Sequence, residues 1–219
     1  MSHQLSVQLL NVTCGLFLLT AVVIVWRREV RALITLLMVQ GLALTGIAAL
    51  LAAQRDSAEA ATIALAIGIL KAGVIPWMLR RVLAQVPDAR ETRPLVNVSA
   101  SLLAAAGLTL LAYAAAQPLA GLAPSAFARA TPVGIAVALL GFFVAATRQR
   151  AISQIIGVLL VDNGIAAVAF LATGGVPLIV ELGVSADLVL AVLVLQILSN
   201  RMHTTFGPTD LDELQELHD

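Results

Sequence analysis

Four ionisable side chains stand inside long apolar runs of the sequence: Lys71, Asp162, Glu181 and Asp187. A charged side chain in the middle of a hydrocarbon layer costs about 2.5–3.5 kcal/mol on insertion scales, so such residues pair with one another or serve ion and proton movement. A proton relay requires groups whose pKa can be shifted toward neutrality, which lysine and carboxylates allow and arginine does not. The single lysine of the chain lies in such a run, whereas all twelve other basic residues are arginine.

The composition of the chain places these side chains in a membrane. The 219 residues are 60% hydrophobic and only 12% charged, and the mean hydropathy is +0.97. Soluble domains carry about 25% charged residues, and so short a chain cannot bury this much apolar surface in its own core, so the excess must face lipid. A formal net charge of zero argues against a nucleic-acid partner. These values exclude a water-soluble globular enzyme.

The sequence predicts no metal site and no cofactor in this chain. Cys14 is the only cysteine, which excludes an intrachain disulfide and a cysteine-ligated cluster. The three histidines, His3, His203 and His218, lie near the termini, where they cannot build a buried haem or zinc site. We therefore expect no catalytic or redox centre within the chain itself.

Seven apolar runs are long enough to cross a bilayer, which predicts an all-α, polytopic integral membrane protein with about seven transmembrane helices. The first run lacks a basic leader and is too long for a signal sequence, so we expect a retained span. The fifth is short, and the semi-apolar stretch 118–132 before it is expected to be a surface loop or a re-entrant piece. The runs cover residues 5–26, 31–54, 59–80, 95–116, 132–148, 151–173 and 177–200.

Arginine is distributed unevenly between the two sides of this arrangement. Ten arginines fall in or beside the segments that follow spans one, three, five and seven, whereas Arg55 and Arg129 fall on the opposite side. Because positive residues accumulate on the cytoplasmic side, we predict a multi-pass protein of the cell inner membrane with its N-terminus outside and its C-terminus in the cytoplasm. The ten residues are Arg27, Arg28, Arg31, Arg80, Arg81, Arg90, Arg93, Arg148, Arg150 and Arg201.

Three of the four ionisable residues are expected at the same membrane depth. At a rise of 1.5 Å per residue, Lys71, Asp162 and Asp187 lie about 14, 18 and 21 Å from the nearest basic residues at the cytoplasmic side. Glu181 is six residues nearer the outside. Two interpretations remain open. Lys71 pairs with Asp162 or Asp187 only to hold helices together, or these residues form a lateral proton relay.

Polar and helix-breaking residues surround these positions. Asn163 follows Asp162 directly, and Gln40 lies in the second span, so both are candidate supporting groups. Of the eight prolines, only Pro76 falls inside a proposed span, which predicts a kink there, while the others, Pro118 included, fall at or beyond span ends. Gly157 and Gly164 are expected to allow close helix contact rather than to bind a ligand.

The spans repeat in a way that divides the chain. Residues 27–53 and 147–174 each begin at a basic pair and run straight into a second span, so spans one to three echo spans five to seven in a 3+1+3 arrangement. The acidic tail is either a short solvated helix or a docking element for a cytoplasmic partner. The expected parts are an N-terminal half with the intramembrane lysine (1–94), a linker helix and outer loop (95–131), a second half (132–200) and the tail (201–219).

The second half resembles a known membrane-protein family. The runs GVLLVDNGIAAVAFL and VELGVSADLVLAVLVLQIL are similar to the membrane subunit called hydrogenase-4 component E, and more distantly to the K subunit of respiratory complex I and the C subunit of Mrp-type antiporters. The run ILKAGVIPWMLRRVL resembles the intramembrane lysine segment of antiporter-like subunits in the same complexes. The likeness to component E extends over essentially the whole chain, and the K-like likeness makes 132–200 a K-subunit-like three-helix unit.

This resemblance implies a role for the carboxylates. In K-like subunits two buried glutamates, on the second and third helices, are implicated in lateral proton transfer. Here Leu159 falls in register with the first glutamate, and Asp162 follows one turn later on the same helix face. The second glutamate falls near Asp187 or at Glu181, depending on the anchor chosen.

The resemblance also implies partners and a function. Antiporter-like and hydrogenase-type membrane subunits would hold the nickel–iron site and the iron–sulfur clusters. This chain would be a non-redox subunit of an energy-converting hydrogenase or complex-I-like assembly, contributing to proton or sodium translocation and to assembly of the membrane arm. Two alternatives are a passive membrane anchor of such a complex and an independent small transporter, although 3+1+3 transporters carry prolines inside helices that have none here.

Overall fold

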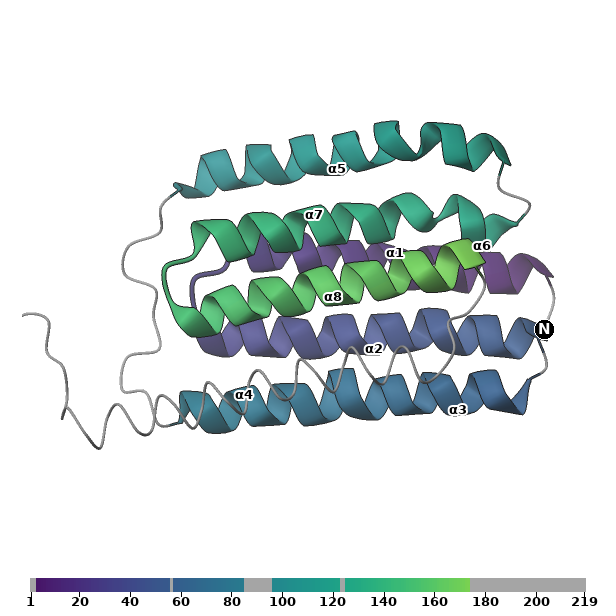
Figure 1. The fold of residues 1–219 in the computed structure, drawn as a ribbon, viewed down its shortest axis with the longest axis horizontal. Coiled ribbons are helices and arrows are strands. Elements are labelled where there is room, and N and C mark those ends of the chain that lie inside the picture. The colour runs from purple at the N-terminus through teal and green to yellow at the C-terminus, as the bar shows by residue number, and fades with distance from the viewer. Residues whose placement is uncertain (1–2, 56, 85–95, 123–124, 174–219) are drawn as a thin grey trace, which may run out of the picture.

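The computed structural model describes residues 3–55, 57–84, 96–122 and 125–173, and within these ranges the chain consists of helices joined by short connections, as Figure 1 shows. The all-α prediction is therefore confirmed. The third span consists of three successive segments, of which the middle one, η1, is π-helical. The elements are α1 (His3–Trp26), α2 (Val30–Arg55), α3 (Ala58–Ile67), η1 (Gly68–Val74), α4 (Ile75–Leu83), α5 (Val98–Leu122), α6 (Ala126–Arg129), α7 (Thr131–Thr147) and α8 (Ala151–Thr173).

Six of the described helical stretches are long and apolar enough to cross a membrane, and they match the first six proposed spans. The seventh proposed span, 177–200, lies outside the described residues, as does the acidic tail 201–219. The chain is thus a multi-pass membrane protein built from helices, with six spans in the part of the chain that the structure describes.

The expectation for the stretch 118–132 is partly wrong. Pro118 ends the apolar span Val98–Pro118, as predicted, but the helix α5 does not end there and continues to Leu122. A proline within a helix removes one backbone hydrogen bond, and the alanine-rich sequence before it is strongly helix-forming, so the helix continues. The fifth span also begins earlier than predicted, because the short helix α6 precedes α7 in one apolar stretch, Ala126–Thr147.

The helices lie side by side along one direction, with α1, α2, α7 and α8 at the centre (Figure 1). The helix α5 packs on α7 and α1 at one side, and the α3–η1–α4 span packs on α2 at the other. In the most apolar stretch of α8, 67% of the residues are buried inside the bundle, whereas in the corresponding stretch of α5 only 17% are buried. The helix α8 is therefore a core element, whereas most of the surface of α5 lies on the outside of the described bundle.

Arginine gathers at one end of this bundle. The connections from α1 to α2 and from α7 to α8 lie at that end, together with the end of α4 and the start of α5, and it is the left end in Figure 1. The opposite end holds Arg55 and Arg129. The described arginines of the first end, referred to below as the basic end, are Arg27, Arg28, Arg31, Arg80, Arg81, Arg148 and Arg150.

Glycines bring α7 and α8 into backbone contact. A Cβ atom added to Gly134 would lie 2.7 Å from the backbone nitrogen of Val168, and one added to Gly164 would overlap the backbone of Ala138. Gly141 and Gly157 meet the facing helix equally closely. The prediction that Gly157 and Gly164 serve close helix contact is confirmed, and such contact is a principal source of association between helices in lipid.

Arg148 joins the ends of α1 and α7. It is 5% exposed, and its Nη2 donates to the carbonyl oxygens of Ile24, Val25 and Arg27 at 3.2, 3.0 and 2.7 Å. The last carbonyls of a helix have no intrahelical donor and carry partial negative charge, so a cation at this position is favourable. In the sequence analysis Arg148 served only as evidence for the orientation of the chain in the membrane. The structure shows that it also holds the end of α1 against α7.

We predict that Gly164→Ala destabilises the protein and that Gly107→Ala does not. The added methyl at position 164 would overlap Ala138 and force α7 and α8 apart, and overpacking of this kind costs about 1–3 kcal/mol. A Cβ on Gly107 meets no atom within 4 Å. Thermal unfolding of the two variants in detergent should show a lower Tm for Gly164→Ala alone; equal Tm values would contradict the close packing of α7 and α8.

Candidate site: a buried lysine–aspartate pair

Lys71 lies on the π-helical segment of the third span. The backbone N–H of Ile75 donates to the carbonyl oxygen of Leu70, five residues earlier, and Pro76 has no N–H to continue an α-helical pattern. Short π-helical segments within α-helices often occur at functional sites. The structure shows this change of hydrogen-bond pattern at the place where the sequence predicts a kink; the kink itself stays a prediction.

A glycine of α2 presses against the backbone of Lys71. A Cβ on Gly41 would lie 2.8 Å from the carbonyl oxygen of Lys71, so only glycine permits this approach. One turn further, the methyl of Thr45 packs similarly close to Gly68. The contacts hold the π-helical segment against α2 and fix where the lysine side chain begins.

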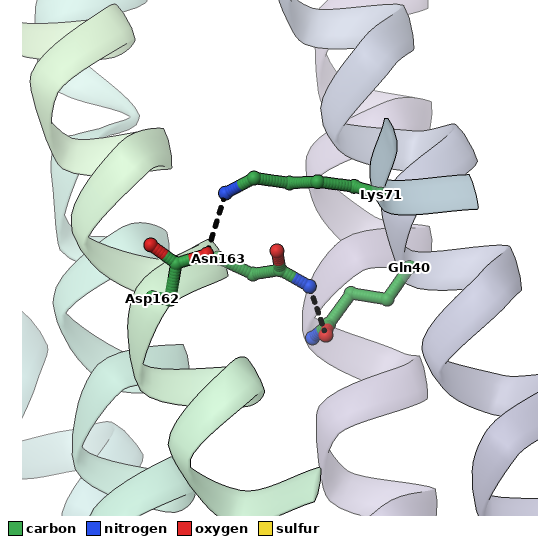
Figure 2. A network of polar contacts seen from close by, with 4 residues as sticks. All are labelled: Gln40, Lys71, Asp162 and Asn163. Carbon is green, nitrogen blue, oxygen red and sulfur yellow. Dashed lines mark hydrogen bonds and ion pairs between the residues drawn. The ribbon is translucent and has the colours of Figure 1, made fainter. Parts of the chain in front are cut away.

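The side chain of Lys71 crosses to α8 and meets Asp162. Its Nζ lies 2.8 Å from Oδ2 of Asp162, and the two side chains are 2% and 10% exposed (Figure 2). Both residues lie near the middle of their spans, as their predicted depths require. Of the two carboxylates that the sequence offers as partners for Lys71, Asp162 is the one with this contact in the described structure.

An amide pair continues the site from α8 to α2 and α1. Asn163 Nδ2 donates to Gln40 Oε1 at 3.1 Å (Figure 2). Gln40 Nε2 in turn donates to the carbonyl oxygen of Phe17 at 3.4 Å. Asn163 is 4% exposed and Gln40 is fully buried. Amides do not titrate in water, so this pair can orient the neighbouring charges and satisfy buried polar atoms but does not carry a proton.

The backbone of α8 beside Asp162 is held by α7. A Cβ on Gly141 would lie 2.5 Å from the backbone nitrogen of Val161, the residue before Asp162. The carboxylate therefore projects from one of the most tightly packed turns of the described bundle. The lysine, in contrast, reaches it through a flexible four-carbon stem.

The remaining predicted site residues, Glu181 and Asp187, lie outside the described residues. Within the described ranges no three His, Cys, Asp or Glu side chains gather closely enough to hold a metal ion. The sequence analysis missed the π-helical segment and the role of Gly41. A signal was present, since Pro76 follows Lys71 by five residues and Gly41 follows Gln40 directly.

Relatives of the chain match nearly its whole length. A Mycobacterium tuberculosis protein described as "Uncharacterized protein Rv0085" is 46% identical over 212 residues, covering 96% of each chain. Hydrogenase-4 component E of Escherichia coli strain K12 is 24% identical over 209 residues, covering 95% of this chain and 97% of its own. No family model matches the chain. No solved structure matches it either.

We predict that Gln40 and Asn163 are energetically coupled. Replacing either by leucine leaves the other buried amide without this partner, so the two substitutions together should cost less than the sum of the singles. The expected coupling is about 0.6–1.7 kcal/mol, the range found for hydrogen bonds between membrane helices. Unfolding free energies of the four proteins in a double-mutant cycle measure it.

A matched cycle serves as the control. Thr109 donates to the carbonyl oxygen of Ala105 within its own helix α5. Thr109→Val combined with Asn163→Leu should be additive within about 0.5 kcal/mol. Equal coupling in both cycles would show that the amide pair has no specific interaction.

Proposed function

The chain belongs to the hydrogenase-4 component E-like family of membrane proteins, and from this premise we propose that it is a non-redox membrane subunit of an energy-converting hydrogenase or a related complex-I-like assembly. The likeness to component E supports this, because it extends across all six described spans. Antiporter-like and hydrogenase-type membrane subunits are the proposed partners, and the nickel–iron and iron–sulfur centres lie in those partners. The basic end faces the cytoplasm in this proposal, and the membrane is the inner membrane.

Within that assembly the chain contributes to proton translocation through the Lys71–Asp162 pair. The observation that carries this proposal is the 2.8 Å contact between Nζ and Oδ2 at mid-membrane depth. A distance of 2.6–3.2 Å between heavy atoms suits direct proton transfer. Transfer from the ammonium to the carboxylate breaks one N–H bond, forms one O–H bond and leaves a neutral amine and a neutral acid. The net charge of the pair stays zero.

A purely structural role, in which the Lys71–Asp162 pair only holds two helices together, explains its burial poorly. Removing two ions from water costs several kcal/mol each, and their attraction repays this only with good geometry and further hydrogen bonds. Replacement of buried ion pairs by apolar residues is often neutral or stabilising. The neutral and ionised forms of a lysine–aspartate pair can be brought close in free energy by their surroundings, which is what a relay needs.

The proposed path extends beyond the pair. Glu181 and Asp187 of the proposed seventh span are the next carriers, and a change elsewhere in the complex shifts the proton affinity of each group in turn. Asn163 and Gln40 support the pair from the side of α2 and α1. The transported ion is a proton in this account; sodium dependence of the same site is tested by the same variants in sodium-free buffer.

We predict that Lys71→Arg and Asp162→Asn abolish proton pumping while the complex still assembles. Arginine preserves the positive charge and the ion pair but does not release its proton, so a structural role would survive the change and a relay would not. The expected loss of pumping in inverted vesicles is at least about tenfold, in line with the removal of a proton-transferring group.

Asp162→Glu is the matched control, because it keeps a titratable carboxyl and should retain part of the activity. The exchange of Lys71→Asp with Asp162→Lys restores the pair in reverse order. Under the alternative of a passive anchor, both Lys71→Arg and this exchange would pump normally, and that result would overturn the relay.

We further predict that the full chain, tagged and solubilised in mild detergent, co-purifies with hydrogenase-type and antiporter-like subunits in a fixed ratio. Mass spectrometry of the purified material identifies those chains, and a tagged unrelated membrane protein of similar size is the control. Recovery of the chain as a self-associated species without partners would contradict the subunit proposal and favour an independent transporter.

A further inference from the structure

A crevice opens at the basic end of the bundle, between the end of α1, the start of α5 and the end of α7. Trp26, Arg28, Ser101, Thr147 and Arg148 are among its lining residues, and it is a shallow, open depression with an enclosed volume of only about 10 Å³. We propose that this crevice binds the phosphodiester headgroup of an anionic phospholipid. The proposal does not depend on proton translocation or on the identity of the partner subunits.

Positive charge converges on the crevice. Arg148 lines it from α7, where its buried guanidinium also holds the end of α1. Arg28 lines it from the α1–α2 connection, is exposed, and makes no hydrogen bond or ion pair to any described residue. Glu29 is the one acidic residue among the neighbouring arginines of that connection. Basic pockets between spans at the cytoplasmic side are the sites that bind anionic lipid headgroups.

A serine hydroxyl with no hydrogen bond to any described residue also lines the crevice. Ser101 is 8% exposed, and its side chain makes no hydrogen bond to any described residue. Thr147, on the facing wall, differs because its hydroxyl donates to the carbonyl oxygen of Phe143 at 2.7 Å. A phosphate oxygen is an acceptor that suits this hydroxyl.

The first turn of α5 adds donors of the same kind. Asn97 caps this helix, since its Oδ1 accepts from the N–H of Ala100 at 2.7 Å, and the first backbone bond of the helix runs from Ser101 to Asn97. The N–H groups of residues 98 and 99 have no acceptor within the helix, and they form its positive end. Val98 itself lines the crevice, so an anion bound there faces this end of α5.

Apolar surface next to the crevice suits acyl chains and distinguishes a lipid from a free anion. Trp26 is 50% exposed, and tryptophan concentrates at the level of lipid headgroups. Below it on α5, Leu102 and Leu103 are 40% and 74% exposed on the least buried helix of the described bundle. A phosphate seated between Arg28 and Ser101 would therefore let its acyl chains follow α5 into the bilayer.

Native mass spectrometry of the full chain in detergent tests this proposal. Phosphatidylglycerol and phosphatidylcholine with the same acyl chains are added at equal concentration, and the bound lipids are counted. We expect the wild-type protein to retain phosphatidylglycerol preferentially. Arg28→Gln should weaken its retention about fivefold, because one basic residue near a membrane surface contributes about 1 kcal/mol, and phosphatidylcholine should be unaffected.

Two further variants make the test specific. Ser101→Val replaces the hydroxyl by an apolar side chain without changing the charge, and it should reduce the preference for phosphatidylglycerol over phosphatidylcholine. Arg31→Gln is the matched control, since Arg31 is an exposed arginine near the same connection but does not line the crevice. Its effect should stay within about twofold.

Four results would overturn the proposal. Equal retention of the two lipids by the wild-type protein shows that there is no anionic site, and equal losses in Arg28→Gln and Arg31→Gln show only diffuse surface charge. Displacement of phosphatidylglycerol by an equal concentration of inorganic phosphate identifies a free anion as the ligand. A preference that emerges only when residues 204–219 are deleted identifies the acidic tail as the occupant of the crevice in the intact chain.

Discussion

The interaction on which the rest of the structure depends is the contact between one ammonium and one carboxylate near the middle of a hydrocarbon layer. A charge on Lys71 or Asp162 alone would be costly there, and the two spans that carry these residues hold their side chains at hydrogen-bonding distance. Glycine contacts supply this constraint on both sides. Gly41 seats the lysine segment on α2, and Gly141 seats the aspartate turn on α7. These two glycine contacts thus fix the spans from which the paired side chains project.

The fold holds Asp162 more rigidly than Lys71. Asp162 projects from α8, the most buried of the described spans, whereas Lys71 projects from a π-helical segment that ends just before Pro76. A long flexible side chain on an irregular segment, opposite a fixed carboxylate, is an arrangement in which the donor can change its partner while the acceptor stays in place. The adjoining amide pair, Asn163 and Gln40, keeps the fixed side polar without adding another titratable group.

The number of spans, their common orientation and the depth of the charged residues could be predicted from the sequence on physical grounds. The length of an apolar run sets the number of spans, and the uneven distribution of arginine sets which connections share an end, so both were predicted. Depth along a span follows from the helical rise, which placed Lys71 level with Asp162. The direction in which a side chain points around its helix axis depends on packing. The sequence therefore offered Asp162 and Asp187 equally as partners of Lys71. The three carbonyl contacts of Arg148 and the continuation of α5 through Pro118 likewise depend on neighbours that no local pattern reveals.

The central claim is that Asp162 gains and loses a proton while the complex works. Infrared difference spectroscopy of the assembled complex, comparing the resting state with the state reduced by hydrogen, reports the carboxylic acid C=O stretch directly. We expect a band that marks protonation of a buried carboxyl group and that is absent from the Asp162→Asn protein but present in a Gln40→Leu control. A spectrum in which Asp162 remains ionised in both states would contradict the account and leave the pair with a structural role only.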